Sequence, residues 1–403
     1  MLRRDPEQPW HPSYWLAALG AGGLSISFFM YLMWLVPHQG FPMPTWQHLS
    51  ALLTGTTALS TGVRPLAILA TLFMLLLALL HFRLLIWNIR EYRVARNTEA
   101  YQRLLGSPSE VQLMTQPLTF AMTVNVCFAL GALCVPGLWS IVEYLFPFAL
   151  LAFAAIGVWS LKLYGRYLSR MLVSGGYRHE EHNHLSPLMA VFTFSMLSVG
   201  FAAPAAMSHV AFVAALAATL SILFLVIAVV SGVLILISGL QAMLQYGLQK
   251  QATPSIWMLI PIMTLLGIEW VRMQHGLSHH FATPVEQGRL FVVLTAIFML
   301  QLGIMLLGYR VMQLNGYLAD HLIGDQRNPV SFGLICPGVA LFVMGMFWWH
   351  LVWVQGGIVT AFGVVYWLGI AGLAVVQFLT LGALLRLSHR LLRHKPVEIA
   401  LME

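Results

Sequence analysis

Histidines form the groups in this sequence that could bind a metal. One polar segment, numbered 179–184, reads His-Glu-Glu-His-Asn-His, and a second group, His275, His279 and His280, follows an apolar stretch. Neither group has the fixed ligand spacing of a known metal site. The three cysteines also lack a C-x-x-C pair. We therefore expect no metal and no cofactor.

Charged residues near the apolar stretches are few. Glu269 and Arg272 stand three residues apart, so they can pair on one face of a helix near its outer end. A proton relay would need carboxylates at mid-depth in the membrane, and none is predicted there. The sequence also shows no nucleophile–base arrangement and no phosphate loop. These observations indicate a protein that is not an enzyme and that moves its substrate with little or no coupling to protons.

Long apolar stretches must position these residues. The chain has 403 residues, of which 59% are hydrophobic and 9% charged, and its mean hydropathy is +0.80. A bilayer-spanning helix needs roughly 20 apolar residues. The sequence predicts ten spans, at about 13–36, 64–88, 117–135, 138–162, 187–206, 210–245, 254–273, 289–314, 329–353 and 357–385. We therefore expect an all-α integral membrane protein in which 1–403 is a single transmembrane domain.

The basic residues predict the orientation of the chain. Nearly all lie before the first span, after the last, or in loops that join an even span to the next odd one, whereas the opposite loops hold few beyond Arg64 and Arg289. Lys and Arg concentrate on the cytoplasmic side of a membrane. Both termini are thus predicted to be cytoplasmic, in the inner (plasma) membrane. The net charge of +7 reflects this topology and does not indicate nucleic-acid binding.

A repeated phrase divides the spans into pairs. A polar residue followed by proline begins each odd span, at His11-Pro12, Gln116-Pro117, Ser186-Pro187, Thr253-Pro254 and Asn328-Pro329. Proline suits the first turn of a helix, and repetition at a regular interval indicates a repeated supersecondary unit. We expect five helical hairpins, at about 12–96, 117–170, 187–248, 254–318 and 329–390, in a quasi-fivefold ring around a central pore.

Positions 4, 8 and 11 residues after each proline share one helical face that is mostly small and uncharged. This face predicts a pore lining made of Gly20, Gly23, Ala121, Asn125, Phe128, Ser195, Ser198, Ile262, Leu265, Gly333, Pro337 and Ala340. Close packing between transmembrane helices explains small residues equally well, and that alternative stays open. A neutral lining with basic mouths suits an anion better than a cation, because cation pores use rings of carboxylates or ordered carbonyls.

The hairpins, the cytoplasmic termini and two phrases give the chain a resemblance to a known family. The phrases are Leu-Gly-Ala-Gly-Gly-Leu at 19–24 and Gly-Val-Ala-Leu at 338–341. The sequence resembles the tellurite-resistance/dicarboxylate transporter family, which includes the TehA channel, plant slow anion channels and fungal sulfite pumps. The resemblance implies five inner helices around a pore in each subunit, a homo-oligomer (a trimer), and transport of chloride, nitrate, sulfite or C4-dicarboxylate-like anions.

The resemblance also implies a gating phenylalanine midway along the ninth span, but this sequence has Pro337 at that position. The gate could instead be Phe332, within Ser-Phe-Gly at 331–333, or another bulky residue such as Phe128, Phe194 or Ile262, or the middle of the pore has no aromatic ring as a gate. Phe332 also fits an interfacial aromatic belt, together with Trp15, Phe120 and Trp257 at the same offset from their prolines.

Two other classes of protein stay open. His81, His209 and His350 could serve as axial haem ligands, which would make the chain a redox or quinone-binding membrane subunit. An assembly or scaffold subunit is the third possibility. The leading hypothesis is an inner-membrane channel or transporter for small anions, whose partners are the anion, the lipid bilayer and other copies of the chain, with no nucleic acid.

Overall fold

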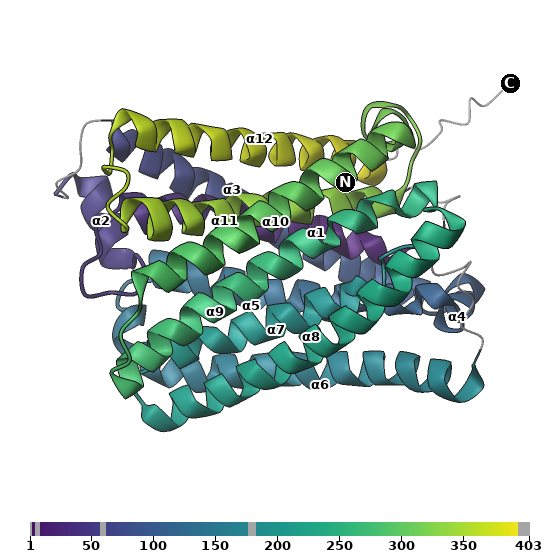
Figure 1. Ribbon diagram of the computed structural model, residues 1–403, viewed down its shortest axis with the longest axis horizontal. Helices are drawn as coiled ribbons and strands as arrows, with labels where there is room; N and C mark the ends of the chain where they lie inside the picture. The colour runs from purple at the N-terminus through teal and green to yellow at the C-terminus, as the bar shows by residue number, and fades with distance from the viewer. Residues whose placement is uncertain (1, 5–8, 57–61, 176–182, 394–403) are drawn as a thin grey trace, which may run out of the picture.

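The protein is described by a computed structural model, which covers residues 2–4, 9–56, 62–175 and 183–393. Those residues are almost wholly helical and include no named strand (Figure 1). The long helices are α1 (Trp15–Leu35), α3 (Val63–Ala95), α5 (Thr115–Cys134), α6 (Val142–Ser174), α7 (Leu188–Met207), α8 (Ala211–Tyr246), α9 (Leu259–Phe281), α10 (Gln287–Leu314), α11 (Ile335–Trp348) and α12 (Val364–Leu392). Two short helices, α2 (Trp46–Thr54) and α4 (Glu99–Leu105), lie in the connections.

Ten helices in the described residues are long and apolar enough to cross a membrane. This number and the all-α fold confirm the prediction of a multi-pass membrane protein. Some helices extend beyond the predicted spans, because charged or histidine-containing ends continue the helix. Thus α3 runs to Ala95 and α9 to Phe281, whereas α12 begins only at Val364, after a turn that contains Gly357 (φ +73°) and Phe362 (φ +63°).

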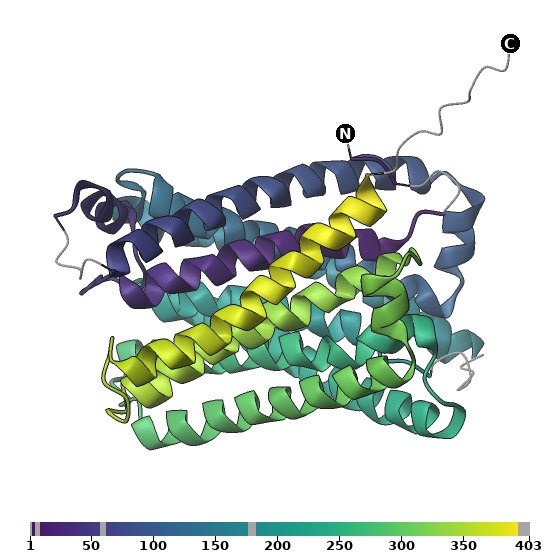
Figure 2. The same cartoon turned by 90° about the horizontal axis from the view of Figure 1, so that it is seen from above.

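Each of the helices α1, α5, α7, α9 and α11 packs against the long helix that follows it in the chain. The five pairs are α1 with α3, α5 with α6, α7 with α8, α9 with α10, and α11 with α12. The second helix of each pair has 28 to 36 residues, and 36 residues of α-helix span about 54 Å. This length exceeds the ~30 Å hydrocarbon core of a bilayer, so these helices are tilted or extend into water. Figure 2 shows α12, in yellow, crossing α11 obliquely.

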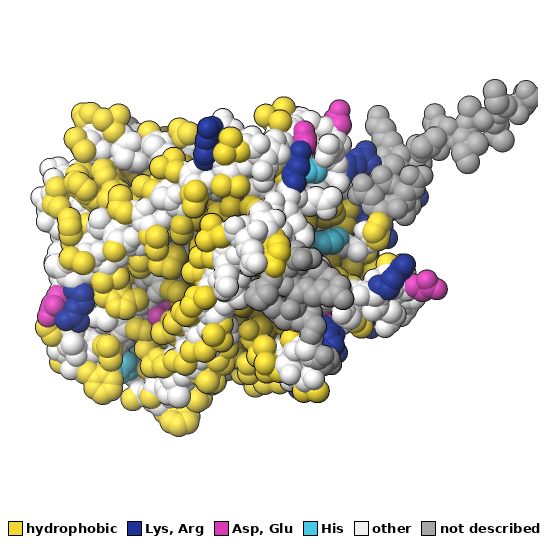
Figure 3. Space-filling view, turned by 45° about the vertical axis from the view of Figure 1, so that its right-hand side comes forward, with side chains coloured by type: hydrophobic (Ala, Val, Ile, Leu, Met, Phe, Trp, Pro, Cys, Tyr) yellow, Lys and Arg dark blue, Asp and Glu magenta, His cyan; other side chains and the backbone are white. Residues whose placement is uncertain are grey.

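The first helices of the pairs also contact one another. α1 packs against α5 and α11, α7 packs against α5 and α9, and α9 packs against α11. In the most apolar stretches of α1 and α7 about nine-tenths of the residues are buried, against about one-fifth in α8, α10 and α12. Apolar side chains cover most of the face in Figure 3, as expected for a surface that contacts lipid.

The polar–proline phrases begin these inner helices in different ways. In the first and last copies the polar side chain is a cap: His11 Nδ1 accepts from the Ser13 N–H at 3.2 Å, and Asn328 Oδ1 accepts from the Val330 N–H at 3.0 Å. A 3₁₀ turn then follows, at Pro12–Tyr14 and Pro329–Leu334. The phrase therefore serves as a helix start because it supplies an acceptor and a residue without an N–H.

The described termini meet at one end of the bundle. The Arg3 N–H donates to the Leu392 carbonyl oxygen at 2.7 Å. We call this end the termini end and the other the distal end. Lys and Arg side chains in Figure 3 gather mainly at the termini end.

Candidate functional site

A cavity of about 650 Å³ lies among α1, α5, α7, α9 and α11. It extends from the distal end, where His38, Met43 and Gln355 line it, to Leu19, Phe192 and Pro261 in the first turns of α1, α7 and α9. Its size falls in the range of small-molecule sites, about 300–1,000 Å³. The helices α1, α5, α7, α9 and α11, which pack against one another around the bundle, thus enclose a mostly apolar space.

The wall of the cavity is apolar with a few polar groups. Most of its side chains are Phe, Met, Ile, Val, Leu and Ala. The polar and charged members are His38, Asn125, Thr264, Arg272, His275, His279 and Gln355. Within the described part of the chain, no Asp or Glu lines the cavity. Its formal charge is therefore positive and comes from Arg272.

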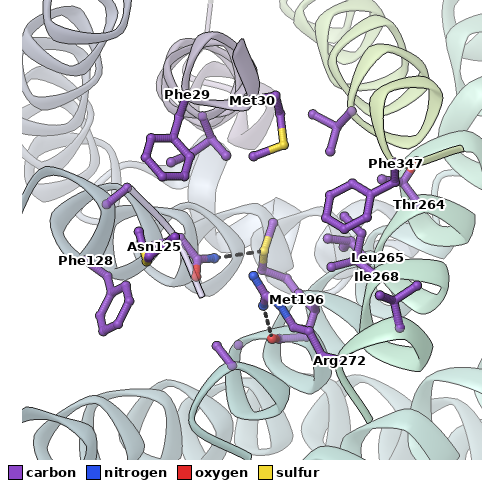
Figure 4. Close-up of a pocket in the computed structure, with 18 of the residues that line it drawn as sticks. Phe29, Met30, Asn125, Phe128, Met196, Thr264, Leu265, Ile268, Arg272 and Phe347 are labelled. Carbon is purple, nitrogen blue, oxygen red and sulfur yellow. Dashed lines mark hydrogen bonds between the residues drawn. The ribbon is translucent and has the colours of Figure 1, made fainter. Parts of the chain in front are cut away.

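Arg272 reaches the cavity from α9, and its guanidinium is held by a backbone group. Its Nη1 donates to the Val199 carbonyl oxygen on α7 at 2.7 Å (Figure 4). No described carboxylate lies within 4.0 Å of it. The guanidinium is half-buried and has no counter-ion among the described residues, an arrangement that electrostatically favours negative charge beside it.

Glu269 does not form the ion pair with Arg272 that their spacing predicts. Its carboxylate faces α8, where Oε1 accepts from the Ser221 hydroxyl at 3.2 Å. Residues three apart on a helix differ by about 60° around its axis. Here this angle places Arg272 at the cavity and Glu269 at the contact with α8. The predicted pairing near the outer surface is therefore wrong, and Arg272 is a cavity residue that sequence reasoning missed.

The sequence of α9 contained a signal for the residues that line the cavity. Leu265, Ile268, Arg272, His275 and His279 follow spacings of 3, 4, 3 and 4, which place them on one helical face, and all five line the cavity. The predicted span ended at 273, so the histidines were assigned to a loop. The helix instead continues to Phe281 and carries the two histidines toward the distal mouth.

Asn125 on α5 and Met196 on α7 lie near the guanidinium (Figure 4). Asn125 Nδ2 donates to Met196 Sδ at 3.4 Å. A thioether sulfur is a weak acceptor, so this amide remains available for a stronger partner. Phe29, Met30, Phe128, Ile268 and Phe347 surround the same space in Figure 4.

The structure brings six of the twelve predicted pore-lining residues to the cavity and leaves six away from it. Those that line it are Gly20, Gly23, Asn125, Phe128, Leu265 and Ala340. Those that do not are Ala121, Ser195, Ser198, Ile262, Gly333 and Pro337. Ser198 faces α8, where its hydroxyl donates to the Ser221 carbonyl oxygen at 3.0 Å.

One set of offsets from the proline does not fit all five helices. After their prolines, α1, α9 and α11 continue a 3₁₀ turn, which advances 120° per residue, whereas α5 and α7 are α-helical almost at once, at 100° per residue. Offsets 8 and 11 line the cavity in both α1 and α5, so the first turn alone does not determine the lining. The cavity also meets offsets 5 and 12 in α5 and α7, and offset 14 in the other three. These residues are Met122, Ala129, Phe192 and Val199 in the first set and Ile26, Ile268 and Val343 in the second.

The fourth and fifth inner helices each contain a second proline, which lies where a 3₁₀ turn changes into an α-helix. Pro261 and Pro337 are each the third residue of an α-helix that follows a 3₁₀ turn. A proline there costs little, because its missing N–H lies in the first turn. They therefore mark where the α-helices begin and do not kink a continuous helix at mid-depth.

The candidate gates lie in different places. Phe128 lines the cavity. Phe194 is fully buried and faces outward, 5.4 Å from the Tyr164 ring and 6.1 Å from the Phe224 ring. Pro337 is buried outside the cavity wall.

Phe332 is fully buried in the turn before α11, four residues toward the termini end from Cys336, which lines the cavity. Its ring lies 6.4 Å from that of Tyr14, and the rings of Trp15 and Phe120 are 5.8 Å apart. These are two separate ring pairs, and Trp15 and Phe120 also contact outer helices, through Tyr92 on α3 and Trp159 on α6. Trp257, the fourth predicted aromatic, instead donates to the Met305 carbonyl oxygen on α10.

The histidines considered for haem or metal have other partners. His81 places its ring nitrogens 2.8 Å from the Ala18 carbonyl oxygen and 2.9 Å from the Thr123 hydroxyl. The ring nitrogens of His350 lie 2.8 Å from the Met346 carbonyl oxygen and 3.0 Å from the Tyr366 hydroxyl. Among the described residues, no group of three or more His, Cys, Asp and Glu side chains is placed to hold a metal ion. Most of the segment 179–184 lies outside the described residues.

The fold and cavity define the class: an all-α, multi-pass membrane protein with a cationic group in an intramembrane cavity. The sequence matches no known protein-family model and no curated protein sequence. The resemblance to the tellurite-resistance/dicarboxylate transporters therefore stays a prediction.

Proposed function

We propose that the protein is a channel or transporter for small anions, whose pathway runs between α1, α5, α7, α9 and α11. The contacts among these helices support a quasi-fivefold ring, with the longer helix of each hairpin outside it. The transported anions would include chloride, nitrate, sulfite or C4-dicarboxylate-like species. The family resemblance adds a homotrimer with one pathway in each subunit.

The observation that carries this proposal is Arg272 in the cavity wall without a carboxylate partner. A cation in such a pore wall lowers the energy of an anion at that depth and raises that of a cation, and pores selective for anions use Arg and Lys in this way. Glu269, the nearest acidic residue along α9, faces α8 instead.

The charge distribution supports an orientation. By the positive-inside rule the termini end is cytoplasmic, so the distal mouth opens outside the inner membrane. In this arrangement the cavity receives anions from outside, and the buried ring of Phe332, 6.4 Å from that of Tyr14, is the proposed closure of the cytoplasmic end.

A flux assay in liposomes tests the proposal. Purified protein is reconstituted and loaded vesicles are given an inward gradient of nitrate, chloride or sulfite, while potassium flux is measured in matched vesicles. We expect anion flux well above that of empty vesicles and little potassium flux. No flux of any of these anions from correctly folded protein would overturn the proposal, and so would a preference for potassium.

A further inference from the structure

We propose that the cavity is a binding site for an organic monoanion, whose carboxylate pairs with Arg272 and whose compact apolar body lies against the cavity wall. This inference rests on the proposed function, because it names the class of ligand that would bind in the same cavity. Its argument comes from the size of the cavity, its wall and its single fixed cation.

The size of the cavity exceeds what a simple anion can fill. Its volume is about 650 Å³, whereas one water molecule occupies about 30 Å³ of liquid. A halide or nitrate would contact only a small part of the wall and would keep most of its hydration shell. A ligand with an apolar body can use the rest of the wall, and burial of that body contributes roughly 25 cal/mol per Å².

The wall beside the guanidinium is suited to an apolar body. Phe29 and Met30 from α1, Phe128 from α5, Ile268 from α9 and Phe347 from α11 surround the space into which Arg272 points (Figure 4). Aromatic rings and methionine side chains adapt to flat or branched apolar groups. Strongly hydrated inorganic anions gain nothing from these contacts.

The polar groups suit one carboxylate. Arg272 uses one N–H on the Val199 carbonyl oxygen, which fixes the guanidinium while leaving further donors for a carboxylate. Asn125 offers its amide from α5, where its one hydrogen-bond partner among the described residues is the Met196 sulfur. Both donors point toward the same space in Figure 4.

The charge count distinguishes a monoanion from a dianion. Arg272 is the one arginine or lysine in the cavity wall among the described residues, and the histidines His275 and His279 lie on the same face of α9 nearer the distal mouth. A second negative charge would enter apolar surroundings without a fixed cation, which is costly. Monocarboxylates should therefore bind more tightly than dicarboxylates of similar shape.

Isothermal titration calorimetry on the full chain in lipid nanodiscs at pH 8 tests this inference. The probes are benzoate, its neutral analogue benzamide and the dianion phthalate. Benzoate should bind ~10–100-fold more tightly than benzamide, as expected for a charge-assisted hydrogen bond, and more tightly than phthalate. Arg272→Gln should weaken benzoate binding by a similar factor and leave benzamide unchanged, whereas Arg272→Lys should retain part of the preference.

Glu269→Gln is the matched control, because Glu269 lies one turn away and faces α8. It should leave benzoate affinity within about twofold of the wild type, as expected for a residue outside the site. The comparison of the three probes on wild-type protein needs no variant, so the inference stays testable if Arg272→Gln does not fold. Equal affinity for benzoate and benzamide, or tighter binding of phthalate, would overturn it.

These outcomes are separate from those of the liposome assay. Nitrate flux without benzoate binding would leave the proposed function standing and reject the organic monoanion. Benzoate binding that depends on Arg272, without flux of any anion, would support the organic monoanion site and reject the proposed transport function.

Discussion

Arg272 and Glu269 stand one turn apart on α9 and do not touch each other. Nη1 of Arg272 donates to the Val199 carbonyl oxygen on α7 at 2.7 Å, while Oε1 of Glu269 accepts from Ser221 on α8 at 3.2 Å. The two charges therefore have different surroundings: Arg272 faces the cavity, whereas Glu269 faces the contact between α9 and α8. This separation makes the cavity cationic although the helix as a whole carries both signs.

The first prediction concerns this separation. Arg272→Gln should lower nitrate flux in liposomes about tenfold or more, because the change removes the cation of the cavity wall and with it a charge-assisted contact worth roughly 1.5–3 kcal/mol. It should also narrow the difference between nitrate and potassium flux. Both quantities are measured in the same vesicle preparation with a membrane potential of fixed sign.

Glu269→Gln provides the control for that experiment. It removes a charge of the opposite sign from the same helix, yet the cavity wall stays as it was. Nitrate flux should remain close to the wild-type value. Equal losses in the two variants would mean that α9 had merely been destabilised, and the assignment of Arg272 to the pathway would fail.

The second prediction concerns a hydrogen-bond network that joins three helices. Gln301 on α10 donates to the Thr264 hydroxyl on α9 at 2.7 Å, and that hydroxyl donates to the Ala340 carbonyl oxygen on α11 at 2.9 Å. Thr264→Val keeps the shape but leaves the buried Gln301 amide short of a partner. It should lower the free energy of unfolding by about 1–3 kcal/mol, measured by thermal unfolding in detergent.

Thr219→Val is the matched control for Thr264. The Thr219 hydroxyl donates to the Ala215 carbonyl oxygen within its own helix, at 2.9 Å, and the residue is exposed on α8. Its replacement should change the stability by no more than about 0.5 kcal/mol, as for an ordinary surface substitution. A loss at Thr264 no larger than at Thr219 would show that the network does not hold the helices together.

The sequence sufficed to predict most of the fold. Ten apolar runs long enough to span a bilayer leave the backbone no alternative to helices, because its polar groups must be satisfied internally. The proline phrases indicated the hairpins, and the paired packing of α7 with α8 and of α11 with α12 agrees with them. Boundaries were less certain, since helices such as α9 continue into histidine-containing ends that resemble loops.

The candidate site was predictable only in part. Small residues such as Gly20, Gly23 and Ala340 were correctly expected on inner helices, and they line the cavity. Ser198 shares the offset of Gly23 and Ala340 from the proline, yet it faces α8, whereas Phe128 at the same offset in α5 lines the cavity. Arg272 looked like an interfacial charge because its span was taken to end one residue later. Helix phase and helix length, which a proline phrase does not specify, decided both outcomes.

The third prediction concerns pH. Burial lowers the pKa of His11 to about 4, below the ~6.5 expected in the unfolded chain, and its neutral Nδ1 accepts from the Ser13 N–H. Between these pH values the unfolded state binds a proton that the folded state excludes. The stability from this group is therefore complete above about pH 6.5 and decreases as the pH falls toward 4.

His11→Asn tests this, because Asn328 performs the same capping role in the fifth copy of the phrase. The variant keeps a cap and loses the ionisable group. The apparent Tm of the wild type should fall more steeply between pH 7 and pH 4.5 than that of the variant, as measured in detergent. Parallel curves would exclude His11 as a source of the acid sensitivity.

The last prediction concerns the closed end of the pathway. Phe332 is a fully buried aromatic side chain between the cavity and the termini end, so Phe332→Ala should open a route there and raise nitrate flux. Phe194→Ala is the control, since Phe194 is equally buried but packs outward against Tyr164 and Phe224. Both changes should cost about 3–5 kcal/mol of stability, so a general loosening of the bundle would affect both alike. Flux that rises only in Phe332→Ala identifies Phe332 as part of the gate, whereas equal changes in the two variants would leave it a packing residue.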